Sequence, residues 1–165
     1  MVTRFPTLFS PIQIGKHTLE NRIVCTGHAT AFHSGGLFTE RHLHYYREKA
    51  RGGAGMIITE ATGVDPTSAV PIGLHNDGSL SIMQRIAAAV HEQPTHILVQ
   101  ITHAGRRLPN PTGVLETVAV APSAIPAPGV DFGQMMPHEL STREVAGLVE
   151  AFGAAAGRAR EAGLD

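Results

Sequence analysis

The sequence predicts an α/β fold in which parallel strands alternate with helices. Its first basis is a set of short apolar runs without polar alternation, as expected of strands buried on both faces of a parallel sheet; these runs are residues 22–26, 56–59 and 96–101. Its second basis is a set of longer segments whose apolar residues recur at helical spacing; these are residues 39–51, 77–92 and 141–163. The two kinds of segment alternate, which is typical of a parallel sheet covered by helices.

Composition places the chain among single soluble domains. Its 165 residues are enough to bury a sizeable core, and we expect one domain over residues 1–165. Lysine and arginine total 13 and aspartate and glutamate 14, and the net charge of -1 argues against nucleic acid or an anionic membrane as partner. The single cysteine, Cys25, cannot form an internal disulfide, so we expect a reducing, cytoplasmic location. No apolar run approaches the ~18 residues of a membrane span.

The first third of the chain predicts a hairpin, a strand and a helix. Short alternating stretches flank Gly15 and Lys16, which predicts a small β-hairpin. The apolar run 22–26 is expected to form a strand that ends at Gly27. Thr39 can cap a helix that runs to about residue 51, where two glycines stop it. Its predicted buried face is formed by Leu43, Tyr46 and Ala50.

The same unit then repeats twice, with a long insertion before the last helix. The helix over 77–92 ends before Pro94, and its predicted buried face is formed by Leu80, Met83, Ile86, Ala87 and Val90. A proline-rich stretch from about 105 to 137 exceeds ordinary loop length, so we expect it to be functional or to contain hairpins. Ser141 and Glu144 form a capping-box pattern, and Gly163 closes the helix behind them. The residues expected to face inward are Val145, Leu148, Phe152, Ala155 and Ala159.

The point at which the sequence stops carries an expectation of its own. Asp165 stands where a helix has just ended and a fourth strand should begin. Periodicity does not separate a doubly wound sheet from a (β/α) barrel, but a whole (β/α)₈ barrel needs about 250 residues. We therefore expect the N-terminal part of a longer protein.

Small and polar residues follow each predicted strand, at the ends where parallel α/β folds gather reactive groups. These segments are 26–29, 60–63 and 100–106. Gly27 and Ala61 allow a flat ligand to approach the backbone. The Gln100 carboxamide offers donors and an acceptor that can read a heterocycle with imide N–H and carbonyl groups. The pattern favours a flat, partly apolar ring over a phosphate or a metal.

Three segments of the chain, in order, resemble the opening of the old yellow enzyme family. They are Leu8-Phe9-Ser10-Pro11-Ile12-Gln13-Ile14-Gly15, Leu19-Glu20-Asn21-Arg22-Ile23-Val24 and Gln100-Ile101-Thr102-His103-Ala104-Gly105-Arg106. The family consists of FMN-dependent oxidoreductases with a (β/α)₈ TIM barrel. The resemblance implies the N-terminal portion of such a barrel, with about three βα units after an N-terminal β-hairpin. The segment 26–29 is most similar to the branch of dienoyl-CoA reductases and trimethylamine dehydrogenase.

The resemblance also implies a set of cofactor-binding residues. The segment 26–29 would lie along the flavin ring, Ala61 would contact the ring, and Gln100 would hydrogen-bond its pyrimidine edge. The implied set is Thr26, Gly27, His28, Ala29, Ala61 and Gln100. His28 matches a histidine of the amine dehydrogenases, in which a flavin-bonding cysteine follows. Ala29 stands in that cysteine's place, so FMN is expected to bind noncovalently.

The resemblance says less about the substrate and the electron donor. The resemblance places Ala31 at a position where some relatives carry a substrate-facing tyrosine, and it makes His103 a second substrate-side residue. NAD(P)H, or an amine substrate, is the implied electron donor. Substrate-orienting and proton-donating residues of relatives, and any iron–sulfur cluster, would lie beyond residue 165, so we assign no catalytic residue and no metal site. The expected partners are a small-molecule substrate and, where the protein forms a homo-oligomer, further copies of the chain.

Several of these residues have plainer interpretations. His103 is as well explained as a hydrogen-bonded wall residue, and Gln100 as a hydrogen-bonding member of a barrel layer. Glu60 can be held in a salt bridge rather than act as a base. His42 and His44 are two positions apart and would not share a helical face.

Two other functions remain open from the sequence. The first is a metal-dependent barrel hydrolase that uses the histidines. The second is a non-catalytic folding or interaction unit, because three parallel strands leave unpaired edges and an uncovered face. On the flavin hypothesis, we expect residues 1–165 alone to be inactive.

Overall fold

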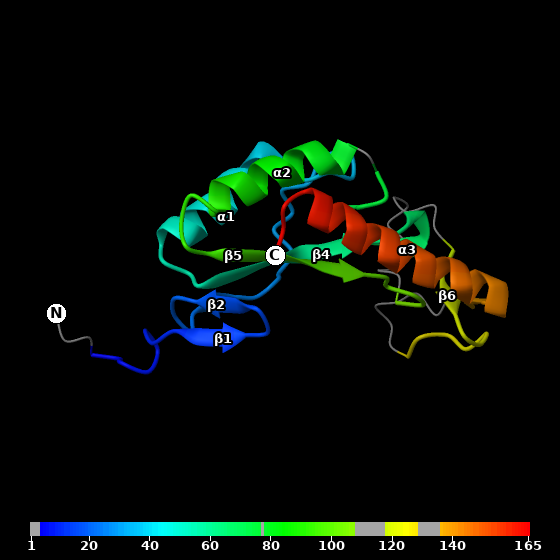
Figure 1. Cartoon of the computed structure of the whole chain (residues 1–165). Coiled ribbons are helices and arrows are strands. Elements are labelled where there is room, and N and C mark those ends of the chain that lie inside the picture. Colours follow the sequence, from blue (N-terminus) through cyan, green and yellow to red (C-terminus); the bar gives the residue numbers. More distant parts are fainter. Residues whose placement is uncertain (1–3, 77, 108–117, 129–135) are drawn as a thin grey trace.

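A three-stranded parallel sheet, ordered β3-β4-β5, forms the centre of the molecule (Figure 1). Its strands are Val24–Cys25, Met56–Gly63 and His96–Thr102. The computed structural model describes residues 4–76, 78–107, 118–128 and 136–165. The parallel pairing of β3 with β4 and of β4 with β5 confirms the predicted fold class.

Three helices cover one face of this sheet. They are α1 (Glu40–Arg51), α2 (Gly78–Val90) and α3 (Thr142–Glu161). A single hydrophobic cluster draws residues from all three helices and from the sheet, which places the core between the two layers. The predicted buried residues of α1 and most of those of α2 belong to it, namely Leu43, Tyr46, Ala50, Met83, Ile86, Ala87 and Val90.

None of the described helices covers the opposite face of the sheet (Figure 1). Alternation along the strands turns Cys25, Ile57 and Ile97 toward the helices, where all three pack in or against the core. Val24 and Leu98 therefore point the other way, and Val24 is 40% exposed. This open inner face is what an incomplete barrel would present.

The predicted hairpin is confirmed, and it lies beside the ends at which the strands begin. It consists of β1 (Ile12–Ile14) and β2 (His17–Leu19), paired antiparallel. Figure 1 shows it apart from the helices, next to the starts of β4 and β5. Gly15 adopts a φ of +57°, a value that suits glycine in so tight a turn.

The first predicted strand is shorter than expected. Residues 22–26 were predicted, but only Val24 and Cys25 pair with β4. β3 is an edge strand, so only one neighbour among the described residues can extend its ladder. β4, by contrast, continues to Gly63 because it pairs with β5 beyond a bulge between Ile58 and Ala61.

Helix α3 differs from its prediction in which residues are buried. Ala155 and Ala159 are buried as expected, but Val145 is 41% and Phe152 36% exposed. Figure 1 shows the N-terminal half of α3 running past the end of the sheet, so the inward assignment of Val145 and Phe152 is wrong for this chain. The capping box is confirmed: the Ser141 N–H donates to Glu144 Oε2 at 2.8 Å, and the Glu144 N–H donates to Ser141 Oγ at 3.3 Å.

The long insertion is only partly described. Residues 108–117 and 129–135 lie outside the described residues. The remainder contributes β6 (Val120–Ala121), which pairs with β7 (His138–Glu139). This pair is parallel, so it is not itself one of the hairpins that were one of the two expectations for this stretch. In the part of the chain that the structure describes, no helix is both long enough and apolar enough to cross a bilayer.

Candidate functional site

Three of the predicted cofactor residues, one from each strand end, lie together. Ala61 and Gln100 are register partners in β4 and β5. Gly27, just after β3, is packed so closely that a β-carbon there would lie 2.5 Å from the Thr59 carbonyl oxygen and 2.7 Å from Gln100 Oε1. Only glycine fits this position without a shift of its neighbours. The C-terminal ends of the three strands thus form one continuous surface.

The Gln100 carboxamide is available to a ligand. Gln100 is exposed, and strand alternation places it on the inner face, opposite the core residue Ile97. No described residue forms a hydrogen bond with its side chain. A carboxamide offers two N–H donors and an acceptor, so it can pair with a ring edge that alternates carbonyl and N–H groups.

A bulge in β4 determines which residues share this surface. Ile58 pairs with Leu98 and Ala61 pairs with Gln100, so β4 has one residue more than β5 between the two pairs. If the same residues alternated regularly without this bulge, Glu60 would share the face of Ile58. With it, Ala61 occupies the inner face and Glu60 turns toward α1.

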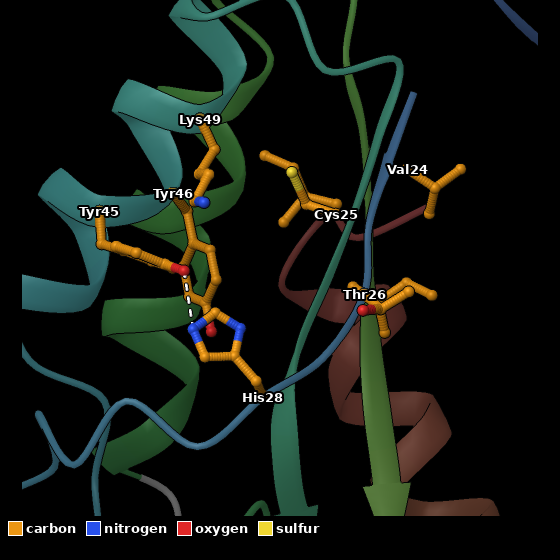
Figure 2. A pocket seen from close by; sticks show the side chains of 9 residues that line it. Val24, Cys25, Thr26, His28, Tyr45, Tyr46 and Lys49 are labelled. Carbon is orange, nitrogen blue, oxygen red and sulfur yellow. Dashed lines mark hydrogen bonds between the residues drawn. The ribbon is translucent and has the colours of Figure 1, made fainter. Parts of the chain in front are cut away.

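The segment after β3 presents its backbone rather than its histidine to the inner face. His28 Nε2 lies 2.9 Å from Tyr45 Oη on α1, with ring centroids 5.7 Å apart (Figure 2). Figure 2 also shows Cys25 on the helix side of the strand and Thr26 on the opposite side. A cavity of about 250 Å³, bordered by β3, β4 and α1, is lined by both His28 and Thr26. Ala29 is exposed.

A buried polar network holds this segment in place. Glu60 is 4% exposed, and its Oε1 accepts from Thr30 Oγ1 at 2.6 Å and lies 2.8 Å from His42 Nε2. Its Oε2 accepts the Thr30 N–H at 3.2 Å. As the plainer interpretation expected, Glu60 is held by partners within the chain, because both carboxylate oxygens have contacts, but these contacts are hydrogen bonds and not a salt bridge.

The protonation of His42 follows from its contacts. His42 Nδ1 accepts the Thr39 N–H at 2.9 Å, so Nε2 carries the proton and donates to Glu60. Burial lowers the pKa of His42 below its ordinary value, although the hydrogen bond and charge of Glu60 oppose that shift. Next to it, the Tyr46 hydroxyl accepts the Glu60 N–H at 3.1 Å, and burial raises the pKa of Tyr46. Sequence reasoning missed this network, although His42 stands three residues after the cap Thr39, where a side chain can bond back to the cap.

The two predicted substrate-side residues are differently placed. Ala31 is exposed and adopts a φ of +57°, in the left-handed region that non-glycine residues rarely enter. His103 has a side chain only 8% exposed. Its Nδ1 accepts the Gly105 N–H at 2.9 Å, and its Nε2 lies 3.0 Å from Thr67 Oγ1. Burial lowers the pKa of His103, against the opposing charge of Asp65.

The parallel strands and the helices on one face define the class of protein: an α/β fold of the kind that forms the N-terminal portion of a (β/α) barrel, with Gly27, Ala61 and Gln100 together at its strand ends. The sequence pattern of the NADH:flavin oxidoreductase / NADH oxidase family matches residues 7–165. The chain therefore belongs to that family, and the resemblance to old yellow enzymes is confirmed.

Solved structures agree with this assignment. Morphinone reductase in complex with tetrahydroNAD superposes with a TM-score of 0.84 and 31% identity, over 97% of this chain and 48% of that one. An old yellow enzyme homologue from Zymomonas mobilis gives a TM-score of 0.80 and 31% identity, over 97% of this chain and 47% of that one.

The curated relatives are longer than this chain. An N,N-dimethylglycine/sarcosine dehydrogenase of Chromohalobacter salexigens is 34% identical over 98% of this chain and 24% of its own length. An NADPH dehydrogenase of Bacillus subtilis is 35% identical over 96% of this chain and 46% of its own length. The chain thus spans between a quarter and a half of the relatives it matches.

Proposed function

We propose that this chain is the N-terminal part of an FMN-dependent oxidoreductase. The whole protein would pass hydride from NAD(P)H, or from an amine substrate, through noncovalent FMN to an acceptor such as an activated alkene. The single observation that carries the proposal is the free Gln100 carboxamide beside Gly27 and Ala61. Relatives named NADPH dehydrogenase and N,N-dimethylglycine/sarcosine dehydrogenase support both kinds of donor.

The residues present fit the ring of FMN. Bound FMN supplies the capacity to accept and to donate hydride. Gln100 would donate and accept hydrogen bonds at the pyrimidine edge, where a fixed neutral dipole stabilises developing negative charge. Gly27 would let the ring approach the backbone of residues 26–29, and the methyl group of Ala61 would pack against it. The Glu60 network would keep that backbone in one conformation.

The proposal that FMN binds noncovalently rests on where the chain carries its cysteine. Cys25 is the only cysteine, and it packs against the hydrophobic core on the helix side of the sheet. Ala29, the residue that follows His28, has no nucleophilic atom. No thiol of this chain is therefore aimed at the inner face.

The substrate side of the site needs groups other than those in this chain. The methyl group of Ala31 cannot donate a proton. Both nitrogens of His103 already have partners within the chain, so we propose that His103 shapes the wall of the site rather than transfers a proton. We infer that residues 1–165 on their own bind FMN weakly and do not turn over, because the inner face of the sheet is open. The whole protein would act in the cytoplasm on a small molecule.

The hydrolase alternative finds no support at the strand ends. Among the described residues, the group of histidine and acidic side chains close enough to hold a metal ion contains His17, His96 and Asp165. This group lies beside the hairpin, at the ends where the strands begin, and not where barrel enzymes carry out their chemistry.

The test is to purify the whole protein and measure bound flavin by absorbance and extraction. We expect FMN, and we expect Gln100→Ala to raise the dissociation constant for FMN about tenfold, as the loss of one good hydrogen bond does. Gln100→Glu, which has the same size but a negative charge, should bind more weakly still. The matched control is Gln13→Ala on the hairpin, where the side chain bonds only the Gly15 carbonyl. A whole protein that stays colourless and takes up no added FMN would refute the proposal.

A further inference from the structure

A second cluster of chemically reactive side chains lies at the opposite end of the sheet. His17 comes from β2 of the hairpin, His96 begins β5, and Asp165 follows α3. Each offers one ligand atom, and these atoms all lie within 4.8 Å of one another. The three residues are far apart in sequence, so the fold alone brings them together.

The carboxylate of Asp165 is held with one oxygen aimed at the two imidazoles. Its Oδ2 accepts the Ile97 N–H at 2.8 Å and lies 2.9 Å from His91 Nε2. Its Oδ1 lies 3.1 Å from His96 Nδ1 and 4.0 Å from His17 Nδ1. Oδ2 is therefore occupied by neighbours that fix the carboxylate, while Oδ1 faces two ring nitrogens.

His96 is placed between two acceptors. Its Nε2 lies 3.3 Å from the Thr18 carbonyl oxygen, which only accepts, so Nε2 carries a proton. Its Nδ1 faces Asp165 Oδ1, which is also an acceptor when ionised. Nδ1 of His96 and Oδ1 of Asp165 therefore face each other across 3.1 Å, a spacing that a metal ion bound to both can bridge.

We propose that His17, His96 and Asp165 bind a divalent transition-metal ion, with zinc as the first choice. Imidazole nitrogen and carboxylate oxygen are common zinc ligands. Metal–ligand bonds of about 2.0–2.1 Å place tetrahedral ligand atoms roughly 3.4 Å apart, and the distances of 3.1 and 4.0 Å to Asp165 Oδ1 bracket that value. A metal ion at this point would also reach His17, whose Nδ1 lies 4.0 Å from Asp165 Oδ1.

The groups around the cluster match the outer shell of a metal site. The Thr18 carbonyl orients His96, while His91 and the Ile97 amide orient Asp165, and such partners fix ligand tautomer and direction. The side chains are 26%, 22% and 19% exposed for His17, His96 and Asp165, so a water molecule can reach the fourth position. A metal ion bound here would link the hairpin to the start of β5 and to Asp165, which follows α3.

The charges nearby set the expected strength of binding. Lys16 and Arg160 line the cavity of about 580 Å³ beside the cluster. Their positive charge opposes a cation, and only three protein ligands are present. We therefore expect binding weaker than that of a closed four-ligand zinc site, and a role in stability rather than in catalysis.

The test uses purified protein freed of metal with a chelator. Calorimetric titration with zinc chloride should show one ion per chain, and cobalt chloride should produce the visible bands of a tetrahedral site. His17→Gln and His96→Gln should each weaken zinc binding at least about tenfold, and zinc should raise the melting temperature of the unmodified protein but not of these variants. The matched control, His44→Gln on the exposed face of α1, should bind as the unmodified protein does.

The proposal is independent of flavin binding. Absence of the tetrahedral cobalt spectrum in the unmodified protein overturns it, whatever the variants do. Zinc binding that is unchanged in both His17→Gln and His96→Gln, with circular dichroism showing both variants folded, also overturns it.

Discussion

His42 and Glu60 form a buried pair in which Nε2 of the imidazole lies 2.8 Å from Oε1 of the carboxylate. The pair joins α1 to the end of β4, and through Thr30 it also fixes the segment that follows the proposed flavin contacts. The pair therefore links the stability of the fold to the shape of the site.

The first prediction concerns the pH dependence of stability. Burial holds the pKa of His42 in the folded protein below its ordinary value of 6.5, and it lowers the pKa of His103 in the same way. The unfolded chain then binds more protons than the folded chain below about pH 6.5, so this stability is fully present above that pH and is lost as the pH falls through the folded pKa values. Urea unfolding should show a lower free energy of unfolding at pH 5.5 than at pH 7.5.

The variant His42→Gln isolates the contribution of the pair. The loss of stability between pH 7.5 and pH 5.5 should be smaller in His42→Gln than in the unmodified protein, because one of the two buried titrating groups is gone. His44→Gln, which removes an exposed histidine two positions away, should leave the loss unchanged. An equal pH dependence in all three proteins would contradict the prediction.

The second prediction concerns the contact between Gly27 and Gln100. A β-carbon at Gly27 would lie closer than van der Waals contact to the Thr59 carbonyl, which is rigid backbone. Gly27→Ala should therefore lower the free energy of unfolding by about 1–3 kcal/mol, as overpacking does, and should weaken FMN binding by the whole protein. Chemical unfolding and flavin titration measure the two effects. Unchanged values for both would show that the strand ends are farther apart than described.

The third prediction is that alanine at another glycine position raises the free energy of unfolding instead of lowering it. Gly147 lies within α3, and apart from the adjacent residues and the backbone of the helix itself, no atom of the described chain lies within 4 Å of a β-carbon built there. Gly147→Ala should raise the free energy of unfolding by about 0.5–1 kcal/mol, because alanine loses less backbone entropy in a helix. Thermal unfolding of the two alanine variants side by side provides the comparison, and a destabilised Gly147→Ala would reveal a partner surface on α3.

The fourth prediction concerns the cap of α3. Hydrogen bonds from the Ser141 side chain and backbone, with a further one from His138, lower the pKa of Glu144 to about 2. NMR titration of the Glu144 carboxyl should give a midpoint near that value. In Ser141→Ala the side-chain bond is lost, so the midpoint should move toward the ordinary value of 4.5. A midpoint near the ordinary value before any substitution would mean that the capping box does not persist in solution.

The order and type of the main elements could be predicted because each shows a clear pattern of apolar residues in the sequence. Continuous apolar runs identified the strands, and the capping residues Thr39 and Ser141 identified two helix starts. Periodicity reports which side of a helix is apolar, however, and not whether anything covers that side. For this reason Val145 and Phe152 were assigned to a core that the described chain does not provide.

The candidate site was predictable where position along the chain decides geometry. Gly27, Ala61 and Gln100 each follow an apolar run, and the ends of neighbouring parallel strands must meet. Contacts between distant segments were not predictable in the same way. The hydrogen bonds of Thr30 to Glu60 and the approach of His17 to Asp165 depend on packing across the whole fold. No local pattern in the sequence indicates these contacts.

The bulge in β4 determines which chemical group would face the ring of the proposed flavin. Glu60 and Ala61 are adjacent, and the bulge before Ala61 decides which of them faces inward. If the same sequence paired with β5 without a bulge, strict alternation would turn Glu60 instead of Ala61 to the inner face, and a carboxylate would replace a methyl group beside the proposed flavin ring. On the proposed function, that carboxylate would oppose the negative charge that flavin gains on reduction, so the pairing of one residue in β4 would affect how readily the proposed cofactor is reduced.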